Sequence, residues 1–297
     1  MNKKHLAFVA LIILMSSLFS SCKKDKDDDT PTPTAEPRLI FKFKFDSTQV
    51  RLDNLGNPSV VPSNHGAQSP RFNKMSAHYI EMTADQFTMP GAGAVLYHAP
   101  ETTVGGANAI DFSQSNAVGN GETFYSIPLK DVNPGTYEWL RVSLAYQNYD
   151  IDLRYTLSGL NFDITGTLAS FIGFNTYIQN FQIKDSTLAV NANKLQGFWA
   201  FETIYGVNQG QAPAGATTVP NPLFATSPIP QGSCLVTGDF ENPLVITGNE
   251  TNDIVVTVSL STNDSFEWME NSTPGYFEPA AGDAVVDMGI RGMKVSY

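Results

Sequence analysis

Alternation of large apolar side chains with mostly polar ones is the feature that most constrains the fold of this chain. It is clearest in residues 38–45 and 254–261, where every second side chain is a large hydrophobe. A period of two places those side chains on one face of a β-strand and leaves the other face polar. The apolar positions are Leu39, Phe41, Phe43 and Phe45 in the first segment, and Ile254, Val256, Val258 and Leu260 in the second.

Similar alternation predicts two hairpins. Residues 122–129 and 137–146 flank an Asn-Pro-Gly-Thr turn, and Pro-Gly suits a type II turn. Residues 151–157 and 160–165 alternate on either side of Gly159. Residues 195–205 fit a helix or a strand, and their aromatic content favours the strand.

Many short strands separated by Gly, Pro and Asn, with no convincing helix, predict an all-β fold of antiparallel β-sandwich type. The sequence leaves open one large domain or two consecutive ones, which would be residues 38–148 and 149–297. Residues 206–232 are rich in Gly, Pro and Ala and are expected to form a long loop.

The amino-terminal segment has the form of a signal peptide over residues 1–21. Lys3 and Lys4 precede an apolar run of ten residues, which is too short to span a bilayer as a helix. Ser20 and Ser21 then stand directly before Cys22. This arrangement resembles the lipobox of bacterial lipoproteins, which implies that Cys22 is acylated and anchors the chain in membrane lipid. An ordinary secretory peptide with an accidental cysteine is the alternative.

A charged run follows Cys22 and continues into a tether over residues 22–37. The run resembles the export signal of Bacteroidota surface lipoproteins, which implies an outer-membrane protein facing the cell exterior. A solvated linker is the alternative. The Thr-Pro repeat in residues 30–34 favours extended, disordered chain. The residues of the run are Lys23, Lys24, Asp25, Lys26, Asp27, Asp28 and Asp29.

The negative net charge excludes one class of binding partner. Removal of the signal peptide takes the net charge from −11 to −13, because Lys3 and Lys4 are lost. Nucleic-acid binding needs a basic surface, so we expect no nucleic-acid partner. With Cys22 acylated, Cys234 has no cysteine to pair with and is expected to be a small buried hydrophobe.

Three histidines, His65, His78 and His98, are candidate metal ligands, although their spacing matches no metal-binding motif. Isolated histidines are the alternative. Calcium is considered at two oxygen-rich segments, residues 239–242 and 248–253, where solvated turns are the default interpretation. No cofactor is therefore assigned from the sequence, with calcium and copper left open.

The order of three segments, 41–43, 78–80 and 127–137, resembles that of MbnP-like lipoproteins. The resemblance covers residues 38–147 and implies a periplasmic or surface lipoprotein, and some members of that family bind copper. The tryptophan-centred copper motif of that family cannot be placed in this chain, so the resemblance supplies no ligands.

Three tryptophans, Trp139, Trp199 and Trp268, are candidate contacts for a glycan or protein ligand, with core packing the alternative for Trp268. Neither a nucleophile elbow nor a phosphate-binding loop is found in the sequence. We therefore expect a non-enzymatic, surface-anchored binding or adhesion module. A glycan-degrading enzyme or its accessory protein and a metal-binding lipoprotein are the alternatives.

Overall fold

A computed structural model describes residues 36–52, 57–212, 228–230 and 232–297. These residues form an all-β protein in which only three short 3₁₀ turns interrupt the strands, which confirms the predicted fold class. The first strands are β1 (Arg38–Asp46), β2 (His65–Gln68), β3 (Arg71–Thr83), β4 (Ala94–His98), β5 (Glu101–Thr102), β6 (Ala109–Asp111) and β7 (Thr123–Pro128). The central strands are β8 (Gly135–Leu157), β9 (Leu160–Phe171), β10 (Asn175–Gln182), β11 (Thr187–Leu195), β12 (Phe198–Thr203) and β13 (Gly206–Gln211). The last are β14 (Cys234–Ile246), β15 (Ile254–Ser261), β16 (Phe266–Met269), β17 (Ala284–Asp287) and β18 (Met293–Ser296). The 3₁₀ turns are η1 (Phe112–Gln114), η2 (Leu129–Asp131) and η4 (Pro279–Ala281).

The long strand β8 is the centre of the main sheet. On one edge it pairs first with β14 and then with β9, and on the other edge it pairs with β3. The sheet continues from β9 to β12 and β13, and from β14 through β18 and β15 to β1 and β7. Because β8 pairs with β14 near its start and with β9 near its end, the two ends of β8 take part in different packing layers.

The main core lies between β1, β15 and β18 on one side and β3, β8 and β14 on the other. Phe41, Phe43, Leu140, Val142 and Val258 are among its members, and each is fully buried. The inward residues are the alternating apolar positions of the sequence, so burial of one face of each strand explains the sandwich.

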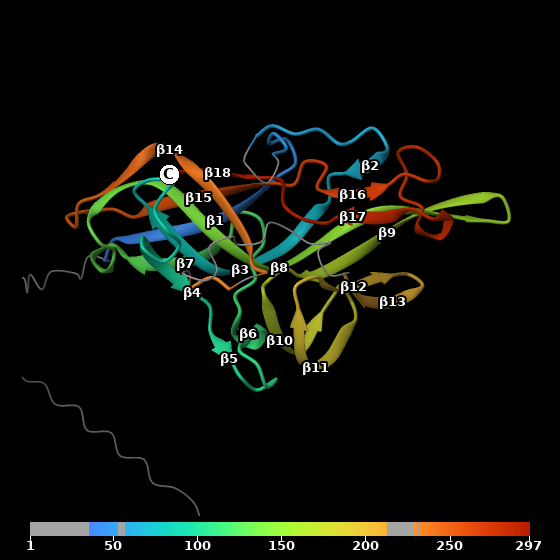
Figure 1. Ribbon diagram of the computed structural model, residues 1–297, viewed down its shortest axis with the longest axis horizontal. Coiled ribbons are helices and arrows are strands. Elements are labelled where there is room, and N and C mark those ends of the chain that lie inside the picture. Colours follow the sequence, from blue (N-terminus) through green and yellow to red (C-terminus); the bar gives the residue numbers. More distant parts are fainter. Residues whose placement is uncertain (1–35, 53–56, 213–227, 231) are drawn as a thin grey trace, which may run out of the picture. The chain divides into compact units, whose positions relative to one another are not determined.

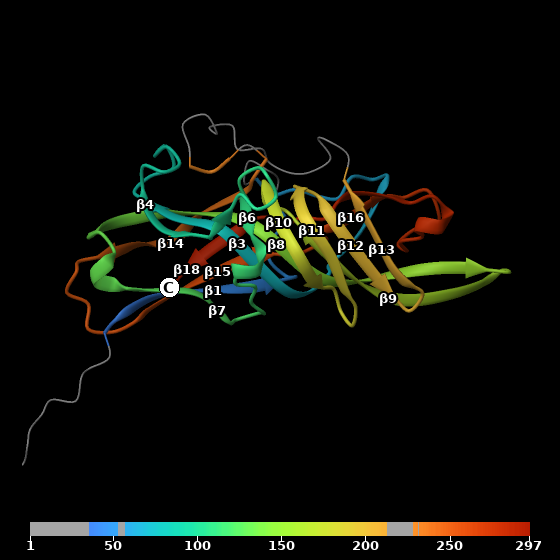
Figure 2. The same cartoon turned by 90° about the horizontal axis from the view of Figure 1, so that it is seen from below.

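Two smaller sheets cover the other half of β8 and β9. The sheet of β5, β6, β10 and β11 packs below them through Phe171 and Phe181, and the sheet of β2, β16 and β17 packs above through Trp268 (Figure 1). Beyond these layers the β8–β9 hairpin extends further than its neighbours (Figure 2).

Most strand pairs are antiparallel, as predicted, but the sheets are mixed. Parallel pairs join β1 to β15, β6 to β10 and β14 to β18. The two strands with the clearest alternation, β1 and β15, are direct neighbours in register from Leu39↔Ile254 to Asp46↔Ser261.

The hairpin predicted over residues 151–165 is confirmed as β8–β9, and residues 198–203 form strand β12. The hairpin predicted over residues 122–146 is wrong. Strand β7 pairs with β1 instead of β8, and the ring of Phe124 stacks on Phe43 with centroids 4.7 Å apart. The segment 206–232 also differs from the expected loop, because β13 begins it.

Residues 36–297 belong to one compact unit. The predicted boundary between residues 148 and 149 falls inside β8, whose backbone pairs continuously with β3 or β9 on both sides of that point. Of the two arrangements left open by the sequence, one large domain is the one that these pairings fit.

Cys234 is buried at the start of β14, as expected of a small hydrophobe, and burial raises the pKa of its thiol to about 12. No helix among the described residues has the length and apolar character needed to cross a membrane. The signal peptide, Cys22, the charged run 23–29 and nearly all of the tether lie outside the described residues.

Candidate metal site

The end of the β3–β4 hairpin brings two of the candidate histidines together. Tyr79 pairs with His98 across the hairpin, and the backbone NH of Ala99 donates to the carbonyl oxygen of His78 at 2.7 Å. Strand β4 ends at His98, and after Ala99 and Pro100 the chain resumes as β5 with Glu101 as its first residue. This local path places a carboxylate beside the two imidazoles.

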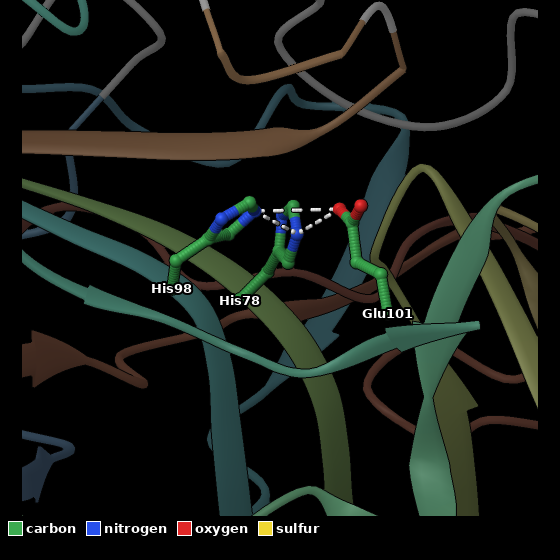
Figure 3. A group of neighbouring side chains, drawn as sticks. All are labelled: His78, His98 and Glu101. Atoms are coloured by element: carbon green, nitrogen blue, oxygen red, sulfur yellow. Dashed lines mark hydrogen bonds and ion pairs between the residues drawn. The ribbon is translucent and has the colours of Figure 1, made fainter.

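Three potential ligand atoms converge at this point (Figure 3). Nε2 of His78 lies 3.1 Å from Nε2 of His98 and 2.9 Å from Oε1 of Glu101. The third side of the triangle, from Nε2 of His98 to Oε1 of Glu101, is 3.3 Å. Lone-pair-bearing atoms gathered this closely repel one another unless protons or a cation lie between them.

The triangle has the dimensions of a metal site. For a tetrahedral ion with bonds of about 2.0–2.1 Å, neighbouring ligand atoms are about 3.3 Å apart. The three observed separations differ from that value by a few tenths of an ångström, so an ion above the triangle needs only small side-chain adjustments. Three protein ligands also leave a fourth position open to water or a solute.

Burial differs sharply across the cluster. The side chain of His78 is fully buried, whereas the side chains of Glu101 and His98 are 23% and 43% exposed. The site therefore sits at the surface with one anchored ligand and two accessible ones. A solvated ion reaches it without opening the core.

The ionisation states suit a cation. Burial lowers the pKa of His78 below its usual value and keeps the imidazole neutral. The hydrogen bond with His78 lowers the pKa of Glu101 to about 2; burial opposes this shift, and the hydrogen bond from the amide of Asn108 adds to it. A neutral imidazole and an ionised carboxylate are the forms that bind metals.

The candidate ligands differ in the hydrogen bonds that hold them in place. Nδ2 of Asn108 donates to Oε2 of Glu101 at 2.6 Å and fixes that carboxylate. Nδ1 of His78 has no hydrogen-bond partner among the described residues. Metal-bound histidines generally donate the proton of their second nitrogen to an acceptor, and the described residues supply none for His78.

The third candidate histidine belongs to a different cluster. His65 on β2 contacts Oε1 of Glu267 through Nδ1, and Arg51 and Arg291 contact Oε2 of the same carboxylate. Arg291 also pairs with Asp287 at 2.8 Å. The structure therefore does not bring the three candidate histidines to one point. Two histidines combine with Glu101, while His65 takes part in a buried ion network.

The three tryptophans do not form one binding surface. Trp268 is buried, as its core-packing alternative predicted, and its indole packs closely over Gly66. Trp199 is partly exposed. It pairs with Ser170 of β9, which pairs in turn with Gln147 of β8, and Gln147 lies eight positions beyond Trp139 on that strand. At about 3.3 Å per residue, this separates Trp139 from Trp199 by roughly 25 Å along the strand.

The oxygen atoms of the two segments considered for calcium belong to regular or turn structure. Residues 239–242 lie within β14 and do not form a loop. The carboxylate of Glu250 accepts hydrogen bonds from the backbone NH groups of Thr247 and Gly248, which makes it a turn-stabilising group.

Sequence reasoning missed Glu101. A histidine three residues before a glutamate is a common spacing and carries little information by itself. Only the register of the β3–β4 hairpin, which brings His78 beside His98, makes Glu101 significant.

The described chain is thus an all-β protein that carries a surface cluster of two histidines and one glutamate. A comparison with protein-family models finds no match. Comparisons with curated proteins and with solved structures find no significant match either. The resemblances to lipoproteins and to the MbnP-like group accordingly stay predictions from the sequence.

Proposed function

We propose that this protein binds a divalent transition-metal ion, Cu(II) or Zn(II), at His78, His98 and Glu101. The observation that carries the proposal is the convergence of three ligand atoms within 3.3 Å of one another. Two imidazoles and one carboxylate form a donor set for first-row transition metals, and calcium prefers a site built from oxygen atoms alone.

We further propose that the protein acts outside the cytoplasm as a lipoprotein of the outer membrane, anchored through acylated Cys22 and facing the exterior. This part rests on the sequence of residues 1–29. Metal binding at the cell envelope matches the third of the three functional classes that the sequence leaves open. It also agrees with the copper-binding members of the MbnP-like group.

Adhesion to a glycan or protein has less support as the principal function. It rests on the amino-terminal segment, the strand pattern and the absence of catalytic motifs, with the tryptophans as candidate contacts, and of these Trp268 is buried while the other two lie far apart. Binding without catalysis remains part of the proposal, because the cluster explains ion capture without any further reacting group.

Titration of the purified, metal-free protein with Cu(II) and Zn(II) tests the proposal. We expect one ion per chain and at least about a 10-fold weaker affinity for Glu101→Gln, since even outer-shell partners contribute that much. Glu138→Gln is the matched control, because Glu138 is exposed on β8 and its substitution changes the charge equally. Equal affinities of wild type and Glu101→Gln would overturn the assignment.

A further inference from the structure

A second concave site lies on the opposite face of the β8–β9–β12 sheet from β10 and β11. Its floor is the sheet, and its roof is the segment from Phe277 to Gly289, which includes η4 and β17. The cavity has a volume of about 510 Å³. Pockets of about 300–1,000 Å³ hold small organic molecules, so the size admits a ligand.

One row of side chains crosses the floor. Gln147 of β8 pairs with Ser170 of β9, and Ser170 pairs with Trp199 of β12. Directly opposite residues of antiparallel strands share a face, so these three side chains lie side by side. Trp199 pairs in turn with Gly210, whose missing side chain leaves room for the indole.

The walls are mainly apolar and aromatic. Phe201, Phe266, Phe277 and Tyr155 line the cavity together with Trp199. Flat aromatic walls favour a flat apolar ligand through dispersion and stacking.

Two carboxylates that line the cavity disfavour anionic ligands. Asp287 pairs with Arg291, and Asp283 accepts hydrogen bonds from the backbone NH of Asn271 and the hydroxyl of Ser272. Neither lysine nor arginine is among the described residues that line the cavity. An anionic ligand would therefore find carboxylates and no cationic side chain on the cavity lining.

The floor also holds two polar atoms without a partner. Oγ of Ser170 and Oε1 of Gln147 have no hydrogen bond among the described residues, and both side chains are fully buried. Nε2 of Gln147 donates to the carbonyl oxygen of Met288 at 2.6 Å, which holds the amide in place. Buried polar atoms are nearly always paired, so this pair of oxygens is an incomplete hydrogen-bonding site.

We infer that the cavity binds a small, neutral, aromatic molecule that carries a hydroxyl group. The aromatic body packs between Trp199 and the roof, and the hydroxyl pairs with Ser170 and Gln147 on the floor. This site is independent of the metal cluster and involves different strands.

Equilibrium dialysis of the purified protein with three related probes tests the inference. We expect 2-naphthol to bind with a Kd below about 1 mM, naphthalene to bind more weakly, and 2-naphthoate to bind least. Val286→Trp places a large side chain in the cavity from a partly exposed position and is expected to weaken 2-naphthol binding at least 10-fold. Trp139→Ala is the control and keeps wild-type affinity.

A second variant tests the proposed hydrogen bond between the ligand hydroxyl and Ser170. Ser170→Ala removes an unpaired buried hydroxyl, so the free protein keeps its stability or gains some, while the preference for 2-naphthol over naphthalene falls. The inference is overturned if 2-naphthol fails to bind at 1 mM, or if Val286→Trp binds it as wild type does. An unchanged preference in Ser170→Ala overturns the assigned hydroxyl contact.

Discussion

The Nε2 atoms of His78 and His98 lie 3.1 Å apart, although 20 residues separate them in the sequence. Two imidazoles hold this geometry only if a proton of one of them lies between the nitrogens or is directed at a common acceptor. Oε1 of Glu101, which is within 3.3 Å of both, is that acceptor in the metal-free protein. A metal ion bound at Nε2 requires the tautomer in which the ring proton lies on Nδ1, so binding would move these protons away from Nε2 and leave Oε1 of Glu101 free to coordinate.

The buried histidine should give the metal-free protein a distinct pH dependence of stability. Burial lowers the pKa of His78 in the folded protein. Below about pH 6.5 the unfolded chain therefore binds a proton at this residue that the folded chain does not bind. The free energy of unfolding should fall from pH 7 toward pH 5 for this reason. The low pKa of Glu101 acts in a separate window, since its contribution is present above about pH 4.5 and is lost as the pH falls toward 2.

Urea unfolding at several pH values measures the His78 effect. His78→Gln should flatten the slope between pH 7 and 5 by up to one proton, or about 1.4 kcal/mol per pH unit. His98→Gln removes an exposed imidazole and should keep most of the slope. An identical slope in His78→Gln and wild type would contradict the role given to burial.

Glu267 should be among the residues most sensitive to neutralisation. Its side chain is almost completely buried and is the counter-charge for Arg51 and Arg291. Glu267→Gln leaves two guanidinium groups without that charge and should lower the free energy of unfolding by about 3–5 kcal/mol. Chemical denaturation measures the loss, and Glu138→Gln should change stability little. A decrease of less than about 1 kcal/mol in the free energy of unfolding would mean that water solvates Glu267, Arg51 and Arg291, contrary to the burial described.

Trp268 should behave as a core residue. It packs against Phe266 and Phe277, with ring centroids 6.1 and 5.5 Å away. Trp268→Ala should cost about 3–5 kcal/mol because it leaves a large cavity. Trp199→Ala, at a partly exposed position, should cost clearly less in the same urea titration. Equal costs for the two variants would argue against the burial described for Trp268.

The sequence predicts the faces of the strands much better than their partners. Alternation in residues 38–45 and 254–261 identifies the buried sides of β1 and β15, because burial imposes a period of two on each strand alone. The parallel pairing of those strands joins residues more than 200 positions apart, as in the Leu39↔Ile254 pair. Packing of whole sheets decides such pairing, and no local pattern records it. The false hairpin between β7 and β8 has the same origin.

The candidate site was only partly predictable for a related reason. His78 and His98 stand out in the sequence because histidine is rare in this chain, but their proximity depends on the register of β3 and β4. Glu101 is one of many acidic residues and gains its role only from that register. His65 was indistinguishable from the other two until the structure placed it beside Glu267.

Pulsed electron paramagnetic resonance of the Cu(II)-loaded protein tests the central claim most directly. Modulation from the remote imidazole nitrogens reports how many histidines bind the copper ion. The proposed site predicts two imidazoles in the wild-type protein, two in His65→Gln and one in His98→Ala. A spectrum without imidazole coupling, or one that changes in His65→Gln and is unaffected in His98→Ala, would contradict a metal site at His78, His98 and Glu101.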